Sequence, residues 1–158
     1  MTDLYVAELQ DAYNAERQLV KALPKLARAA QTSELKAAIH EHLEQTQNHL
    51  TRLEKILGDL NERPGGEVCE AMQGLVAEGE DMMKADGEDA VRDAGLIVAA
   101  QKVEHYEIAA YGSLRNFAHL LNREDDVSLL EQTLEEEKSA DRRLTELADQ
   151  VVNRRAVA

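Results

Sequence analysis

The chain has 158 residues, of which 44% are hydrophobic, 31% are charged and only 3% are aromatic. This length and balance are typical of one all-α domain that is large enough to bury a core, and no segment alternates as a β-strand does. The net charge of −13 argues against binding to nucleic acid or anionic membranes, and no stretch approaches the ~18 consecutive apolar residues of a membrane span. We therefore expect a single domain over residues 1–158, with cations as its natural partners.

The first predicted helix runs from a cap at Thr2 or Asp3 to about Ala30. Its apolar residues recur at helical spacing, and Glu16 falls inside that apolar stripe. Pro24 should kink the helix, since its ring removes one backbone hydrogen bond, yet the stripe continues in phase beyond it. We therefore predict one helix. The N-terminal residues have neither the basic nor the apolar region of a secretory signal, so we predict a cytoplasmic protein.

The second predicted helix follows a cap at residues 32–33 and runs to about Leu57, where Gly58 suits a C-cap. The short link before it implies that it is antiparallel to the first helix. His42 and His49 are seven residues apart and therefore share one face of this helix, beside its apolar stripe.

A shorter amphipathic helix is predicted over residues 67–85, after the turn signal NERPGG. The single cysteine, Cys69, excludes an intrachain disulfide and is expected to behave as a small buried hydrophobe. About 19 helical residues span nearly 30 Å, which is the length of a bundle. This segment can therefore carry the chain from one end of the bundle back to the other, as the long crossover of a ferritin-like four-helix bundle does.

The third long helix is predicted over residues 88–121, and Asn122 should end it. Its central part would read as buried helix except for Glu104 and Glu107, which both fall on the apolar side. An ionised carboxylate taken out of water costs several kcal/mol unless it is paired, hydrogen-bonded or bound to a cation. The two acids therefore require a partner inside the bundle.

The fourth long helix is predicted to begin with a cap at Asp125 or Asp126, and its inward row extends to Val151. Glu137 and Asp141 lie on that inward row among leucines.

Inward polar residues thus occur near the middle of all four long helices, and helix midpoints share one layer of a bundle whichever way each helix runs. Five carboxylates in that layer cannot all stay ionised without cations, and two divalent ions would neutralise four of them. Carboxylate and imidazole groups between four helices form the usual di-metal site of such bundles, for iron and also for manganese or zinc. The predicted ligands are Glu16, His42, His49, Glu104, Glu107, Glu137 and Asp141.

The alternative is a buried polar network without metal, in which some acids are protonated or paired with the histidines and fix the register of the helices. His40, His105 and His119 are expected at the surface or behind the ligands. Tyr13 and Tyr111 lie near the acids, and each could hydrogen-bond a ligand or simply pack in the core with a satisfied hydroxyl.

Three segments carry a resemblance to a known family. They are ELQDAYNAERQLVKALPKLARAA, VRDAGLIVAAQKVEHYEIAAYGSL and LLEQTLEEEKSADRRLTELA, and together with their surroundings they closely resemble the YciE/YciF family of bacterial ferritin-like proteins. The resemblance covers nearly the whole chain. It implies a stress-associated, cytoplasmic four-helix bundle that is usually a homodimer or other small homo-oligomer, with a two-metal site and no established reaction.

The resemblance also implies roles for individual residues. Glu16 is similar to the single glutamate of the first ferritin helix, and Glu104 with Glu107 resembles the paired glutamates of the third. Glu137 with Asp141 stands where a Glu-x-x-His motif is expected. The second helix departs from the pattern in two places: Gln45 stands where many family members carry a glutamate, and the expected Glu-x-x-His reads Thr46-x-x-His49. The ligand of the second helix is therefore open between three residues. The three are His42, Gln45 and His49.

Overall fold

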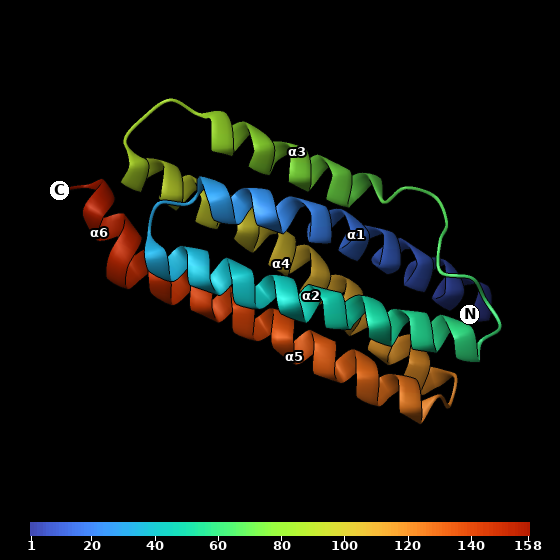
Figure 1. Cartoon of the computed structure of the whole chain (residues 1–158). Helices are drawn as coiled ribbons and strands as arrows, with labels where there is room; N and C mark the ends of the chain where they lie inside the picture. Colours follow the sequence, from blue (N-terminus) through green and yellow to red (C-terminus); the bar gives the residue numbers. More distant parts are fainter.

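Four long helices pack side by side in the computed structural model, which describes all 158 residues. Helices α1 and α2 pack closely as one pair and α4 and α5 as another (Figure 1). No β-strand is present, so the predicted all-α class is confirmed. None of the helices combines the length and the apolar character that crossing a membrane requires. The long helices are α1 (Thr2–Ala29), α2 (Ser33–Asp59), α4 (Asp89–Leu120) and α5 (Glu124–Leu147).

The short helix α3 (Glu70–Lys84) is the crossover between the two pairs. It lies along the outside of α1 and α4 and returns the chain from the end of α2 to the start of α4 (Figure 1). Helices α2 and α4 consequently run in the same direction, whereas each closely packed pair is antiparallel. This is the topology predicted from the length of the segment. Pro24 lies inside α1, which continues through it as one helix.

Left-handed asparagines end two of the long helices. Asn61 has a φ of 58°, and the N–H of Glu62 donates to the carbonyl of Leu57 at 2.9 Å, as in a Schellman ending. The predicted cap at Gly58 was therefore wrong: Gly58 lies within α2, because asparagine also tolerates the left-handed conformation. Asn122, with a φ of 57°, ends α4 as predicted.

The helix starts differ more from the predictions. Helix α1 is preceded by Met1 at the N-cap rather than by Thr2 or Asp3. Helix α5 begins at Glu124, so Asp126 lies in its first turn and is no cap.

Asp126 is instead a buried acceptor, to which the Tyr5 hydroxyl donates at 3.0 Å and with which the Arg123 guanidinium pairs. Helix α3 begins at Glu70, three residues after the predicted start, because residues 65–69 are not helical: Gly65 has a φ of 137° and Cys69 is extended. At its other end α5 passes through a π-helical turn (Ala148–Val152) into the short helix α6 (Asn153–Ala156).

Two separate apolar clusters fill the bundle, one towards each end. The Leu96 cluster lies towards the end that holds the C-terminus, and the Leu114 cluster lies towards the end that holds the N-terminus (Figure 1). A layer of buried polar side chains separates them, and every long helix contributes to it. The Leu96 cluster includes Leu19, Leu26, Ile39, Leu96 and Leu144, and the Leu114 cluster includes Leu9, Leu53, Ile56, Leu114 and Leu130.

Candidate metal centre

Six of the seven residues predicted as ligands lie in this polar layer, and none of the six exposes more than 6% of its surface. Each occupies the apolar face of an amphipathic helix at the point where that helix crosses the layer, so the helical period alone turns it inward. The six residues are Glu16, His42, His49, Glu104, Glu107 and Glu137.

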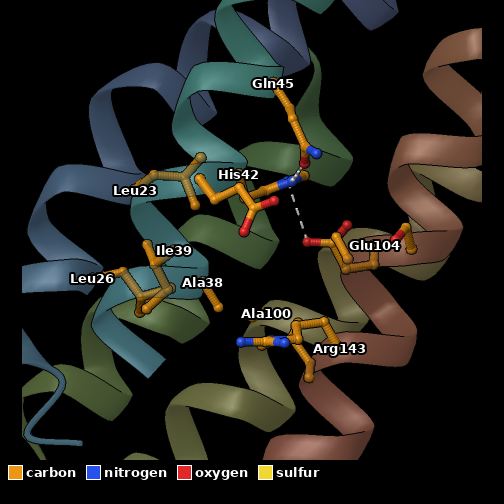
Figure 2. A pocket seen from close by; sticks show the side chains of 13 residues that line it. Leu23, Leu26, Ala38, Ile39, His42, Gln45, Ala100, Glu104 and Arg143 are labelled. Carbon is orange, nitrogen blue, oxygen red and sulfur yellow. Dashed lines mark hydrogen bonds and ion pairs between the residues drawn. The ribbon is translucent and has the colours of Figure 1, made fainter. Parts of the chain in front are cut away.

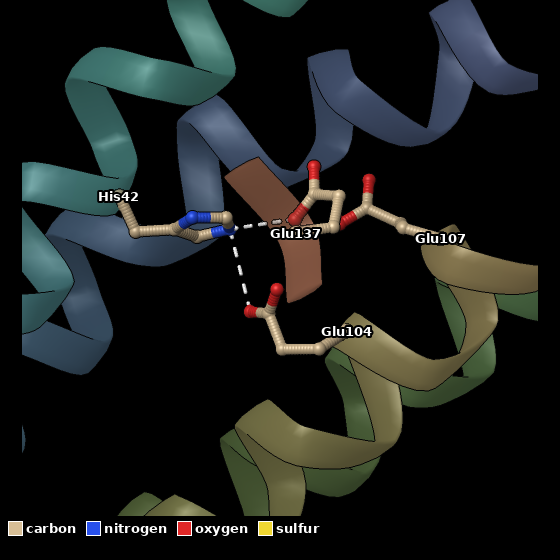
Figure 3. Close-up of side chains that lie close together, drawn as sticks. All are labelled: His42, Glu104, Glu107 and Glu137. Carbon is tan, nitrogen blue, oxygen red and sulfur yellow. Dashed lines mark ion pairs between the residues drawn. The ribbon is translucent and has the colours of Figure 1, made fainter. Parts of the chain in front are cut away.

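The first group of converging side chains comes from α2, α4 and α5 (Figure 3). It contains His42, Glu104, Glu107 and Glu137, and one potential ligand atom of each lies within 4.8 Å of the others. His42 Nε2 is 3.3 Å from a Glu104 oxygen and 3.6 Å from a Glu137 oxygen. Three carboxylates and one imidazole nitrogen therefore face a common point.

The second group adds α1 to the site. His49 Nδ1 is 3.1 Å from Oε1 of Glu16 and 2.9 Å from Oε1 of Glu137. Glu137 is the one residue that belongs to both groups.

The tautomer of His42 is set by Gln45, the neutral residue of the second helix that the sequence left open as a ligand. The His42 Nδ1–H donates to Oε1 of Gln45 at 3.3 Å. A neutral His42 then carries its lone pair on Nε2, the nitrogen that faces Glu104 and Glu137. Gln45 thus orients the imidazole.

Thr46, which stands in place of the glutamate of the expected Glu-x-x-His motif, donates its hydroxyl to the His42 carbonyl at 2.9 Å. Its oxygen is therefore turned to the backbone of its own helix and away from the two groups.

His49 is held from both sides. Its Nδ1 faces Glu16 and Glu137, and its Nε2 lies 2.8 Å from Glu136, a residue that the sequence reasoning missed. Burial opposes protonation of His49, but its close contacts with the carboxyl groups of Glu136, Glu137 and Glu16 outweigh burial and raise its pKa to about 11. In the metal-free protein His49 is consequently an imidazolium.

Arg52 completes this side of the site, and it too was missed. Its guanidinium makes a two-pronged contact with Glu136, at 2.7 and 3.0 Å. Burial alone would raise the pKa of Glu136, but the hydrogen bonds from His49 and Arg52 lower it to about 2. The signal available in the sequence was the spacing of Arg52 three residues after His49, which places both on one face of α2.

The acids of the first group are shifted in the opposite direction. Burial raises the pKa of Glu104 and of Glu137 to about 8. Burial, together with the charges of Glu137, Glu16 and Glu104, raises the pKa of Glu107 well above its ordinary range. A neutral solution without cations therefore leaves protons on these carboxyls, and a cation that binds them must displace those protons.

The donor atoms fit a pair of metal ions. Seven buried side-chain atoms have no hydrogen-bond partner, although His42 Nε2 and both Glu137 oxygens make ion-pair contacts, and all seven belong to five residues of the polar layer. Each such atom costs about 1–3 kcal/mol when it is left unsatisfied. Carboxylate oxygen and imidazole nitrogen are the donors that iron, manganese and zinc accept. The five residues are Glu16, His42, Glu104, Glu107 and Glu137.

Asp141, the seventh predicted ligand, is not brought into either group. It accepts a hydrogen bond from Gln101 at 3.1 Å and pairs with the exposed His105 at 3.3 Å. His105 lies at the surface, as expected, and its contact with Asp141 keeps that carboxyl group at the edge of the site. The position one residue beyond the i+3 spacing and the shorter side chain keep Asp141 away from the centre.

The two tyrosines near the acids have different roles. The Tyr111 hydroxyl donates a short hydrogen bond to Oε1 of Glu16, and both side chains are buried. Burial, followed by the charges of Glu16 and Glu107, raises the pKa of Tyr111 well above its ordinary value, so it remains a donor. The Tyr13 hydroxyl donates to Glu54 at 2.9 Å and does not reach a metal-ligand candidate.

The long crossover and the buried carboxylate and imidazole layer define a ferritin-like bundle. A solved two-domain protein of Anabaena variabilis with DJ-1/ThiJ/PfpI-like and ferritin-like domains shares this fold, at 19% identity and a TM-score of 0.64, over 94% of this chain and 37% of that one. Residues 1–157 match the family described as a domain of unknown function, DUF892, and the chain belongs to that family.

Closer relatives confirm the predicted membership in the YciE/YciF group. Protein YciF of Escherichia coli (strain K12) is 44% identical over 155 residues, which cover 98% of this chain and 93% of that protein. The crystal structure of this E. coli stress protein superposes with a TM-score of 0.92 over 96% of each chain. YcfI of Rhodopseudomonas palustris, named as a proposed structural protein, is 39% identical, with a TM-score of 0.88 over 92% of each chain.

Proposed function

We propose that residues 1–158 act as one ferritin-like domain that binds two divalent metal ions, iron or manganese in the first place and zinc as an alternative. The observation that carries this proposal is the set of seven buried atoms without a hydrogen-bond partner, which face one another between the four long helices. A folded protein rarely leaves so many polar atoms unsatisfied in one place unless a ligand completes them.

The two groups assign ligands to the two ions. The imidazole of His42 and the three carboxylates that face it would hold the first ion, and the carboxylate of α1 with the second imidazole would hold the second. Four glutamates then balance the four positive charges of two divalent ions. The ligands are His42, Glu104 and Glu107 for the first ion, Glu16 and His49 for the second, and Glu137 for both.

His49 reaches the second ion through Nδ1, the nitrogen that faces Glu16 and Glu137. Metal binding requires that this nitrogen lose its proton, while Nε2–H continues to donate to Glu136. A carboxylate behind a ligating histidine fixes the ring and raises its basicity. Glu136, anchored by Arg52, supplies that support before any metal arrives.

The chain's own residues define the chemistry that the site favours. Iron or manganese would supply electron transfer towards dioxygen or peroxide. The Tyr111 hydroxyl donates a hydrogen bond to Glu16 and so fixes its carboxylate. The two apolar clusters keep bulk water away from the polar layer at both ends of the bundle. The E. coli relative is named as a stress protein, and we extend this association to the present chain, as a cytoplasmic homodimer or other small homo-oligomer.

The second candidate function is a structural stress protein that binds no metal. One observation favours it: Tyr111, Glu16, His49, Glu136 and Arg52 form a continuous chain of hydrogen bonds that spans all four long helices without any ion. Such a network can fix the register of the helices by itself. It does not, however, provide partners for Glu107 or for His42 Nε2.

Elemental analysis separates the two functions. The protein is purified without chelator and also reconstituted anaerobically with Fe²⁺ or Mn²⁺, and metal is counted per chain. We expect two ions per chain in the parent. In the Glu107→Gln variant, which loses a ligand that has no hydrogen-bond partner, we expect loss of the first ion. Absence of stoichiometric metal after reconstitution would assign the protein to the structural class.

A further inference from the structure

A cavity of about 180 Å³ leads from the surface between α2 and α5 to the first metal group. Its inner end is formed by His42 and Glu104, and its mouth by exposed side chains of α2 and α5 (Figure 2). An apolar cavity of about 150 Å³ is large enough to hold benzene. The space therefore suits an organic molecule of similar or slightly larger size.

The walls and the mouth of the cavity have different chemistry. Leu23, Ile39 and Leu144 are buried apolar wall residues. Arg143 is the only Lys or Arg residue that lines the cavity, and its guanidinium makes no ion pair and no hydrogen bond within the protein. It extends from α5 across the cavity towards the side on which Ala38 lies (Figure 2).

The charges fix the orientation and the class of ligand. Glu104 lies at the inner end, where no Lys or Arg side chain lines the cavity, so that end offers an anionic group no cationic side chain. Arg143 attracts an anionic group near the mouth of the cavity, because a guanidinium binds a carboxylate through two parallel hydrogen bonds. Glu41 also lines the opening and disfavours a second negative charge there.

We propose that this cavity is the substrate-binding site and that it takes a small monocarboxylate with an apolar body, held at its carboxylate by Arg143. The apolar body then lies between the leucine and isoleucine walls, with its far end against His42 and Glu104. The proposal deepens the proposed function, on which it rests for the metal ions at the inner end. It concerns binding, and the ligand can therefore be tested without metal.

Calorimetric titration of the metal-free full-length chain with benzoate tests the proposal, and benzamide serves as the neutral probe of matched shape. We expect saturable binding of benzoate and at least tenfold weaker binding of benzamide. Arg143→Ala should weaken benzoate binding about 10- to 100-fold, as expected for the loss of a charge-assisted pair. The same substitution should leave benzamide binding unchanged.

Two further variants serve as controls. Arg142→Ala removes the same charge from the adjacent exposed position, which does not line the cavity, and should leave benzoate binding as it is in the parent. Ala38→Leu fills the wall of the cavity and should abolish binding of both probes, with an unchanged circular dichroism spectrum as the check on folding.

Three outcomes would overturn the proposal: no saturable binding of benzoate to the parent, equal binding of benzoate and benzamide, or equal benzoate binding by the parent and the Arg143→Ala variant. Its failure is distinct from that of the metal assignment. If elemental analysis finds no metal but benzoate binding depends on Arg143, the metal assignment fails and the ligand class stands. If metal binds and benzoate does not, the ligand class fails and the metal assignment stands.

Discussion

The two histidines of α2 are both buried, and yet their surroundings are opposite. His49 has an acceptor at each nitrogen, and the chain of Glu136 and Arg52 fixes it from behind. His42 has one nitrogen on Gln45, and the other has no hydrogen-bond partner and faces the cavity. The comparison shows that both nitrogens of His49 are paired with acids of the protein, whereas one nitrogen of His42 has no hydrogen-bond partner.

Removal of each imidazole is the strongest way to test this difference. In metal-free protein we expect His49→Gln to destabilise the fold by about 3–5 kcal/mol, because Glu136 and Glu16 lose a buried cation. The matched His42→Gln variant should change stability by less than about 1 kcal/mol, since that side chain makes only one hydrogen bond. Urea denaturation with chelator measures both, and equal losses would remove the distinction between the two histidines.

The stability of the metal-free protein should depend on pH in two separate ranges, one set by Glu104 and Glu137 and the other by His49. The folded pKa of Glu104 and Glu137, about 8, lies above their ordinary value of 4.5, so their contribution is fully present below pH 4.5 and is lost as the pH rises towards 8. The folded pKa of His49 is about 11 against 6.5, so its contribution is lost only as the pH rises from 6.5 towards 11.

Between pH 5 and 6.5 the decrease in stability should therefore come from the acids that face His42, and between pH 8 and 10 from His49. Each titrating group contributes up to about 1.4 kcal/mol per pH unit. Melting temperatures measured across both pH ranges test this assignment. Glu104→Gln should reduce the pH dependence between pH 5 and 6.5, and His49→Gln should reduce it between pH 8 and 10. Metal affinity should rise with pH over the first window, since ligation displaces the same protons. A melting temperature that rises from pH 5 to 6.5 in metal-free protein would contradict the assignment.

Glu137 belongs to both halves, so its substitution should affect both ions at once. Saturating metal at ~100 times its dissociation constant stabilises the parent by about 2.7 kcal/mol, and Glu137→Gln should lose most of this gain. Its metal-free form should be about as stable as the parent at neutral pH, because burial keeps a proton on Glu137 and glutamine is a neutral side chain of the same size. Melts of both proteins with chelator and with anaerobic Fe²⁺ or Mn²⁺ decide the point, and equal metal-induced shifts would exclude Glu137 as a ligand.

The smallest expected effects are on metal affinity and come from Glu136 and Gln45, which contact the imidazoles of His49 and His42. Glu136→Gln should weaken binding of the second ion by about 10- to 100-fold, and Gln45→Ala should weaken binding of the first by about tenfold. Competition with a metal-sensitive dye measures both affinities. If each variant weakened both ions equally, the two supporting contacts would not belong to separate halves.

The sequence was sufficient to predict the four long helices, the crossover and six of the inward polar residues. These depend on helical periodicity, and Glu16 and Glu137 could face only inward once the apolar stripe was drawn. Arg52 and Glu136 lie at the edge of that stripe, where a long side chain reaches the centre only if the neighbouring helix presents a partner. Asp141 lies at a similar edge and finds Gln101 instead. Such positions depend on helix packing, which periodicity does not determine.

The division of the core into two apolar clusters also has a consequence for hydrogen exchange. The Leu96 and Leu114 clusters each contain residues from all four long helices, whereas the layer between them consists mainly of buried carboxyl groups and imidazoles. Amides at the two ends can therefore stay protected while those beside the polar layer open locally, because each cluster is a cooperative unit in its own right. Ligands that join the four helices at their middle would couple the two ends into one unit, so that a metal-loaded chain opens only as a whole.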